Sequence, residues 1–325
     1  MDAGLKNAAF LTGPSDLLVM MSALARDDII LSRWIIVLMS NGGNIPPAML
    51  DTCRVMAPGA EVFILDVQDE AARNALLAHT GRRFSTVAIS HLLGKGEEAV
   101  LSALDWDELI LTENGIATHI LPAGRVRRLG PDGRPGFSPD AAILPLASWP
   151  GMGLPSYLDP ARPPRLIATD PGFYRHLHAR LQAAFALTPL ARRIAVAPTF
   201  ALVAGTSKCR KNLLSEAAES EAYRTRLAAL AEGRRAAVVL WKPHPRLTLD
   251  IAAMPDGVIT EERPLPIELF LPFDHPAGSM HSTSSTSLLF AHLWHNVTPH
   301  LIDVDMDTTH HPQIEKIWTL VSALD

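Results

Sequence analysis

The stretch AAVVLWKPHPR, residues 236–246, decides the fold class of this chain. Its first half is almost pure Ala, Val and Leu, which is typical of a parallel strand that is buried on both faces of its sheet. Lys242 to Arg246 then bring charge, two prolines and an imidazole to the carboxyl end of that strand. In open α/β sheets, ligands bind outside the carboxyl ends of the strands. The stretch therefore predicts an α/β unit with a ligand site at this edge.

The same alternation of short apolar strands with helices continues outward along the chain. A first series of expected strands covers residues 8–12, 34–39, 61–65, 85–90 and 108–112. A second begins at 194 or 200 and continues with expected strands over 236–241, 258–260 and 300–304. Such alternation favours parallel sheets with helices on both faces. We expect an N-terminal Rossmann-like domain over 1–185, a second over 186–311 and a closing helix over 312–325. We expect the two domains to face each other across a cleft.

Length and composition narrow the class of protein. A chain of 325 residues is long for a single core and favours two domains. A formal net charge of −5 argues against a nucleic-acid partner. No apolar run reaches the roughly 18 residues of a membrane span, and no signal peptide is evident, so we expect a cytoplasmic protein. Arginines at 125, 127 and 128 can form a solvated loop, and they leave open contact with an anionic acceptor or peripheral contact with the inner membrane. Two cysteines predict neither a disulfide scaffold nor a metal site.

Three short segments place reactive side chains where an expected strand gives way to a turn. They are LTENGI (111–116), WKPHPR (241–246) and HSTSSTS (281–287). Together they supply a carboxylate, an imidazole whose backbone is restricted by a proline on each side, and a cluster of hydroxyls. Transfer of a sugar from a phosphate-activated donor needs these three chemistries: a base for the acceptor, a proton donor for the leaving phosphate, and hydrogen bonds that hold that phosphate.

Each segment also has a purely structural interpretation. Glu113 can be a simple polar strand end, and the two prolines can mark a turn. The hydroxyl run can cap the helix expected over 287–294. A cap and a phosphate site are compatible, because a helix N-terminus presents free N–H groups to an anion. Asp303, Asp305 and Asp307, after the last expected strand, are the alternative candidates for binding a cation.

In this order, the three segments resemble the motifs of the bacterial sialyltransferases of the lipooligosaccharide and capsular polysialic acid types. That family has an acidic-acidic-Gly motif, a His-Pro motif and a Ser-Ser motif. They correspond here to Glu113-Asn114-Gly115, His244-Pro245 and Ser284-Ser285. The stretches FLTGPSDLL (10–18) and ALVAGT (201–206) are similar to the openings of the family's two domains. The resemblance therefore spans most of the chain.

The resemblance implies a GT-B fold and an inverting, metal-independent transferase that moves sialic acid from CMP-sialic acid to a glycan acceptor. The CMP-sugar is then a substrate, and no cofactor is expected. Glu113 would be the general base, His244 would donate to the departing phosphate of CMP, and Ser284 and Ser285 would bind that phosphate. The remaining candidates are, on the donor side, Lys242, Pro245, Gly205 and Thr206, and on the acceptor side, Gly13, Ser15, Asn114 and Gly115.

Two other functions stay open on the sequence. One is transfer of another CMP-activated nonulosonic acid or a related keto-sugar acid by the same fold and motifs. The other is a non-catalytic nucleotide- or glycan-binding protein, which Asn114 in the second acidic position supports. A nicotinamide dehydrogenase is disfavoured because G-x-G-x-x-G is missing.

Overall fold

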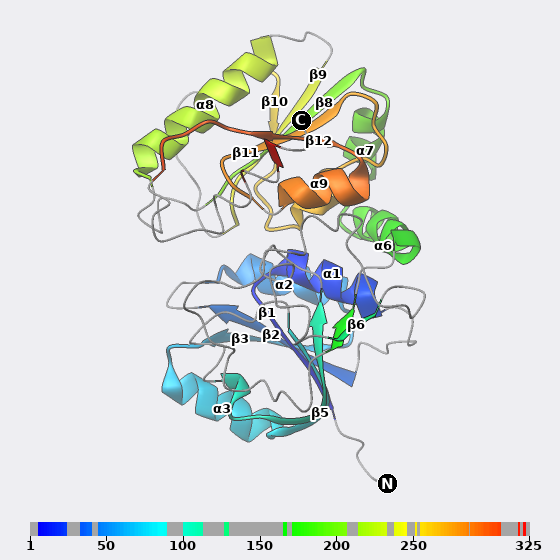
Figure 1. Cartoon of the computed structure of the whole chain (residues 1–325), viewed down its shortest axis with the longest axis vertical. Helices are drawn as coiled ribbons and strands as arrows, with labels where there is room; N and C mark the ends of the chain where they lie inside the picture. The colour runs from blue at the N-terminus through cyan, green and yellow to red at the C-terminus, as the bar shows by residue number, and fades with distance from the viewer. Residues whose placement is uncertain are drawn as a thin grey trace. The chain divides into compact units, whose positions relative to one another are not determined.

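The computed structural model of the chain consists of two compact units, Met1–Leu177 and His178–Asp325 (Figure 1). The residues that the structure describes are 6–24, 33–40, 45–89, 100–112, 127–129, 165–167, 171–206, 214–232, 237–245, 251, 254–285, 287–306, 318 and 321–322. The expected closing helix over 312–325 lies largely outside them. The division between the units falls within one helix, α6 (Pro171–Ala184).

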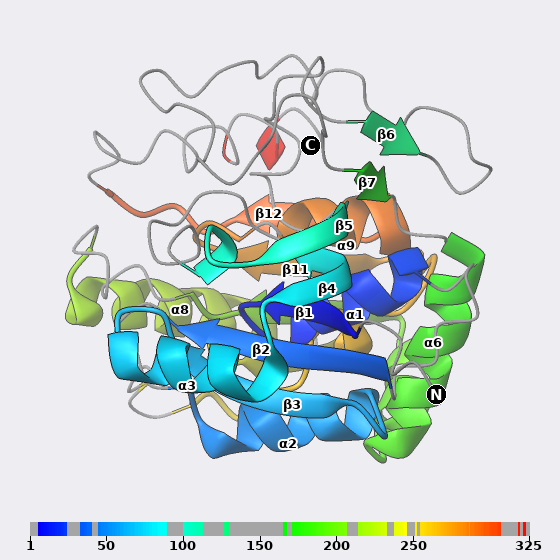
Figure 2. The same cartoon turned by 90° about the horizontal axis from the view of Figure 1, so that it is seen from below.

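The N-terminal unit is a parallel sheet of seven strands in the order β3-β2-β1-β4-β5-β7-β6. The strands are β1 (Asn7–Leu11), β2 (Trp34–Ser40), β3 (Glu61–Asp66), β4 (Arg83–Ile89), β5 (Asp105–Thr112), β6 (Arg127–Leu129) and β7 (Arg165–Ile167). Helices α1 (Pro14–Leu24) and α2 (Pro47–Met56) lie on one face and α3 (Glu70–Thr80) on the other (Figures 1 and 2). β2 is buried along its whole length, which explains its unbroken apolar sequence.

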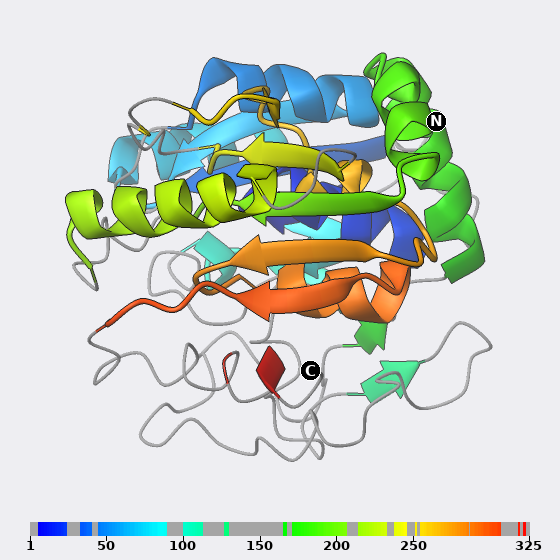
Figure 3. The same ribbon diagram turned by 90° about the horizontal axis from the view of Figure 1, so that it is seen from above.

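The C-terminal unit is a parallel sheet of five strands in the order β10-β9-β8-β11-β12. The strands are β8 (Thr199–Ala204), β9 (Ala237–Lys242), β10 (Val258–Thr260), β11 (Gly278–Ser282) and β12 (Thr298–Leu301). Its helices are α7 (Thr188–Ala195), α8 (Glu216–Glu232), α9 (Ser287–His295) and a short 3-10 helix, η5 (Ile267–Phe270). Figure 3 shows α8 on one face of this sheet and α9 on the other.

The predicted fold class, α/β with the two Rossmann-like domains of the GT-B type, is confirmed at the level of these two units. Among the described residues, no helix combines the length and the apolar character needed to cross a membrane.

Three expected strand positions need correction. The strand expected over 108–112 already begins at Asp105. Of the two expected starts of the second series, 194 is wrong, because Ile194 belongs to α7, whose first turn contains Pro189. The last strand was expected over 300–304 but spans Thr298–Leu301, where Thr298 pairs with Ser279 of β11. Pro299 is tolerated there because β12 is an edge strand.

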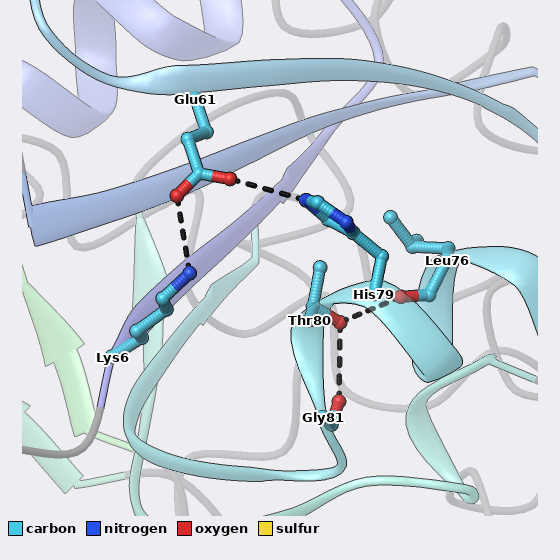
Figure 4. Close-up of polar contacts among 6 residues, drawn as sticks. All are labelled: Lys6, Glu61, Leu76, His79, Thr80 and Gly81. Carbon is cyan, nitrogen blue, oxygen red and sulfur yellow. Dashed lines mark hydrogen bonds and ion pairs between the residues drawn. The ribbon is translucent and has the colours of Figure 1, made fainter. Parts of the chain in front are cut away.

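A charged cluster ties α3 to the amino ends of the strands in the N-terminal unit (Figure 4). Lys6 Nζ donates to Glu61 Oε1 at 3.1 Å, and His79 Nε2 lies 3.4 Å from Glu61 Oε2. The hydrogen bond from Lys6 lowers the pKa of Glu61. The His79 ring packs edge-on against Phe63, with 5.2 Å between the centroids. All three side chains are about half exposed, so the cluster adds little stability. It lies at the amino edge of the sheet, opposite the carboxyl edge at which α/β sheets bind ligands.

Candidate functional site

The strand order brings three of the predicted site segments to one edge of the C-terminal sheet. β8 lies between β9 and β11, and all three strands are parallel. Their carboxyl ends therefore lie side by side and continue into Gly205-Thr206, Pro243–Pro245 and Thr283–Ser285, respectively. The structure thus brings together the donor-side candidates, which are separated by up to 80 positions in the sequence.

Gly205 lets the His-Pro segment approach β8 closely. Its N–H donates to the carbonyl of Lys242 at 2.8 Å. A Cβ at this position would lie 2.8 Å from the backbone nitrogen of His244 and 3.2 Å from Cα of Pro243. Two of the nearest atoms are backbone atoms, so neither can move aside cheaply. The position therefore has no room for a side chain, and the close contact of Gly205 with the His-Pro segment helps to fix the position of His244.

His244 lies two residues after the end of β9 and is half-buried. Pro243, the residue before it, is buried, and Pro245, the residue after it, is half-buried. A proline at 245 disfavours the helical conformation of His244, and the ring of Pro243 fixes the preceding φ angle. The imidazole is therefore carried by a restricted backbone at the carboxyl edge and retains partial access to solvent.

Lys242 is the last residue of β9 and is only 3% exposed. Burial lowers the pKa of its ammonium to about 8, an effect that the charge of nearby Glu261 partly opposes. Trp241 packs against Tyr223 of α8, with 5.0 Å between the ring centroids. Because side chains alternate along a strand, Lys242 projects to the opposite face, on which α9 lies. A buried ammonium therefore lies on the same side of the sheet as α9.

The two adjacent serines have different environments. Ser285 begins the turn into α9: its Oγ accepts from the N–H of Ser287 at 3.2 Å, and its carbonyl accepts from the N–H of Leu288 at 3.1 Å. Ser284 is 1% exposed, and in the described part of the chain its buried Oγ has no hydrogen-bond partner. Buried hydroxyls in proteins are nearly always paired, so the Ser284 hydroxyl is a candidate for binding a ligand atom.

The Thr206 hydroxyl belongs to a buried network behind this edge. It donates to Oε1 of Glu219 at 2.5 Å and lies 2.8 Å from the hydroxyl of Thr283. The hydroxyl of Tyr223 lies 3.2 Å from Thr206 Oγ1 and 3.1 Å from Thr283 Oγ1. Thr206 was predicted as a direct donor ligand. In the structure, its hydroxyl is engaged with protein groups.

Glu219 and Tyr223 were not predicted from the sequence. Both belong to α8, and both are fully buried. The signal that was available is their spacing of four residues, which places both side chains on one face of a helix. The neighbouring residues Ala222, Leu227 and Leu230 belong to a hydrophobic cluster, so the spacing alone gives no reason to expect a polar network there.

In the N-terminal unit, Gly13 and Ser15 lie where β1 turns into α1. The carboxylate of Asp16 accepts hydrogen bonds from the N–H of Thr12 at 2.6 Å and from its hydroxyl at 2.7 Å, which fixes this turn. In the sheet, β2 and β3 lie on one side of β1, and β4 and β5 lie on the other side. The strand order therefore reverses at β1, and α/β sheets bind ligands at such a switch point. The acceptor-side prediction for Gly13 and Ser15 is compatible with this position and stays a prediction.

Glu113, Asn114 and Gly115 lie outside the described residues. The last described residue before them is Thr112, the end of β5, which is fully buried. In the described part of the chain, the Thr112 hydroxyl has no hydrogen-bond partner. The described residues contain no group of three or more acidic, histidine or cysteine side chains that could hold a metal ion. Asp303 and Asp305 follow β12 without forming such a group, and Asp307 is outside the described residues.

No protein-family model matches the sequence, and neither does any curated protein. Among solved structures, the chain is similar to UDP-GlcNAc 2-epimerase from Neisseria meningitidis bound to UDP-GlcNAc, with 10% identity and a TM-score of 0.47 over 98% of this chain and 89% of that chain. It is also similar to UGT89C1 from Arabidopsis thaliana complexed with UDP, with 11% identity and a TM-score of 0.43 over 98% and 94%. Similarity at this level concerns the fold alone.

Proposed function

We propose that this protein is a nucleotide-sugar-dependent glycosyltransferase that moves sialic acid from CMP-sialic acid to a glycan acceptor, with inversion and without a metal ion. The observation that carries the proposal is the buried hydroxyl of Ser284 at the turn into α9, which has no hydrogen-bond partner among the residues that the structure describes. Helix N-termini bind phosphate through free N–H groups, and a phosphate oxygen would give the Ser284 hydroxyl an acceptor. Because Ser284 is 1% exposed, binding has to open a path to it.

The residues around this turn suit the departure of a phosphate. The buried ammonium of Lys242 projects to the α9 side of the sheet, where it would offset the negative charge of the phosphate. His244 is half-buried on a restricted backbone and can donate a proton or a hydrogen bond to the leaving oxygen. These groups act on charge that increases as the glycosidic bond to phosphate breaks, which is where preorganised donors accelerate a reaction.

In the proposed reaction, an acceptor hydroxyl oxygen attacks the anomeric carbon as the bond from that carbon to the CMP phosphate breaks. The hydroxyl proton goes to Glu113 and the bonding electrons leave with CMP, whose phosphate is bound by Ser284, Ser285 and Lys242. A single displacement of this kind inverts the anomeric centre. The acceptor would be held by the β1–α1 turn with Gly13 and Ser15, and by Asn114 and Gly115. If the acceptor is a glycolipid, transfer to it would bring the protein into peripheral contact with the inner membrane.

The first test is a calorimetric panel of CMP, UMP, UDP, ADP and NAD with EDTA present throughout. We expect binding of CMP above the others, and loss of that binding when Ser284→Ala is combined with Ser285→Ala. The matched control is Ser22→Ala, because Ser22 is a fully buried serine of the N-terminal unit whose hydroxyl donates to Leu18. A preference for another nucleotide would contradict the donor class.

Catalysis is tested by His244→Ala, which should lose orders of magnitude in transfer rate while CMP still binds. Wild-type turnover in a folded His244→Ala protein would contradict the role of the imidazole. Transfer from a different CMP-activated keto-sugar acid would keep the mechanism and change the donor. CMP binding with neither transfer nor hydrolysis by the wild type would identify a non-catalytic nucleotide-binding protein, which is the alternative that Asn114 supports.

A further inference from the structure

Tyr223 of α8 belongs to the buried network behind the serine turn and makes three hydrogen-bond contacts there. Its side chain is fully buried, and its hydroxyl lies within 3.1–3.4 Å of Thr206 Oγ1, Thr283 Oγ1 and the backbone nitrogen of Thr283. Burial raises the pKa of Tyr223, so the phenol keeps its proton and can donate as well as accept. One hydroxyl on α8 thus links the turns that follow β8 and β11.

The buried carboxyl of Glu219 sets the direction of these hydrogen bonds. Thr206 gives its single hydroxyl proton to Glu219 Oε1. Thr206 Oγ1 can then only accept from its other neighbours, so Thr283 Oγ1, at 2.8 Å, is the donor to it. The Tyr223 hydroxyl accepts from the backbone N–H of Thr283 and directs its own proton to the two threonine oxygens.

Thr283 is consequently held at three of its polar groups. Its N–H contacts Tyr223, its hydroxyl contacts Thr206 and Tyr223, and its carbonyl accepts from Trp318 Nε1 at 2.8 Å. The preceding residue, Ser282, is also fixed, because its hydroxyl donates to the carbonyl of Ala204 at 2.9 Å. Ser284 follows directly, so the direction in which its hydroxyl projects depends on this anchored backbone.

We propose that Tyr223, acting with Thr206 and Glu219, is a positioning residue that holds Thr283 and thereby presents Ser284 to the phosphate of the nucleotide. The inference rests on the proposed function, since it assumes that a phosphate binds at Ser284. None of the three side chains touches the ligand. They act through the position of the Thr283 backbone. Their effect on nucleotide affinity is therefore confined to the part that the phosphate contributes.

The test compares CMP with cytidine, which lacks the phosphate, by calorimetry on the folded full-length chain. Tyr223→Phe removes only the hydroxyl. We expect it to weaken CMP binding about tenfold, the worth of roughly one hydrogen bond, and to leave cytidine binding unchanged. Thr206→Val should act in the same way, and Thr206→Ser should retain wild-type affinity because it keeps the hydroxyl. Tyr174→Phe is the matched control, since Tyr174 is a buried tyrosine of the N-terminal unit.

The possible outcomes separate the two proposals. A lower melting temperature with an unchanged ratio of CMP to cytidine affinity would show that Tyr223 is merely structural and would overturn the inference. If the wild type prefers another nucleotide, the donor class fails, and the same comparison is made with that nucleotide and its nucleoside. If no nucleotide binds more tightly than its nucleoside, the proposed function and the inference are both overturned.

Discussion

Replacing Lys242 with methionine should stabilise the protein and remove phosphate binding. Lys242 is 3% exposed, and burial lowers its pKa from 10.5 to about 8. The native state therefore holds an ammonium where the charged form is disfavoured. Methionine has a similar length, no charge, and the flexibility to fill an irregular apolar space. The substitution removes the unfavourable burial of charge and, with it, the cation that is proposed to face the phosphate.

The size of the effect follows from the pKa difference. Each pKa unit corresponds to about 1.4 kcal/mol, so a change from 10.5 to about 8 amounts to about 3 kcal/mol. Below pH 8 the lysine is charged in both states, and the native state bears the full penalty. Between pH 8 and 10.5 the unfolded chain binds more protons than the native chain, so wild-type stability rises with pH. The advantage of Lys242→Met should therefore be largest near neutral pH and disappear above pH 10.5.

Urea unfolding of both proteins at pH 7.0, 8.5 and 10.0 measures this difference. Lys6→Met is the control, because Lys6 is about half exposed and its ion pair with Glu61 should change stability by less than about 1 kcal/mol. CMP calorimetry on the same samples should show the opposite order, with the more stable variant binding more weakly. A variant that is no more stable at pH 7.0, or whose advantage stays constant as the pH rises, would refute the reasoning.

Three further predictions each concern a single residue. Gly205→Ala should lower both stability and transfer rate, because its Cβ would lie 2.8 Å from the backbone nitrogen of His244; unchanged unfolding and turnover would contradict this. Burial lowers the pKa of His178 to about 4, so the unfolded chain takes up the extra proton, and stability should fall by about 3 kcal/mol as the pH drops from 6.5 to 4. Denaturation of His178→Gln should show a flatter pH dependence. Burial raises the pKa of Cys53 to about 12, so alkylation followed by mass spectrometry should modify it only on unfolding.

The parts of the fold that could be predicted are those in which local sequence carries the signal. β9 was recognisable because a buried parallel strand needs apolar residues on both faces, and β10 spans the predicted Val258–Thr260. Three other short strands were harder to recognise. β6 and β7 have three residues each, too few for any period to show, and β12 contains a proline that argues against a central strand.

The candidate site also has features that the sequence predicts and features that it does not. The polar residues at the carboxyl end of an apolar strand, Lys242 and His244 among them, could be placed at the sheet edge from the sequence. The environment of each side chain could not. A lysine at the end of a strand, followed by a proline, is expected in solvent, whereas Lys242 is buried. Glu219 becomes part of the site only because Thr206 and Thr283, 77 positions apart, meet beside it in three dimensions.

The adjacent serines show why a motif alone cannot assign roles, and they give the last prediction. Ser285 accepts from the N–H of Ser287, so Ser285→Ala should cost about 1 kcal/mol of stability, as the loss of a helix cap does, and should weaken CMP binding less than Ser284→Ala does. Ser284 has no partner within the described chain, so Ser284→Ala removes an unpaired buried hydroxyl and should leave stability unchanged or raise it. The same variant should lose CMP binding. If Ser284→Ala destabilises the ligand-free protein while CMP binds normally, the hydroxyl is structural and the phosphate binds elsewhere.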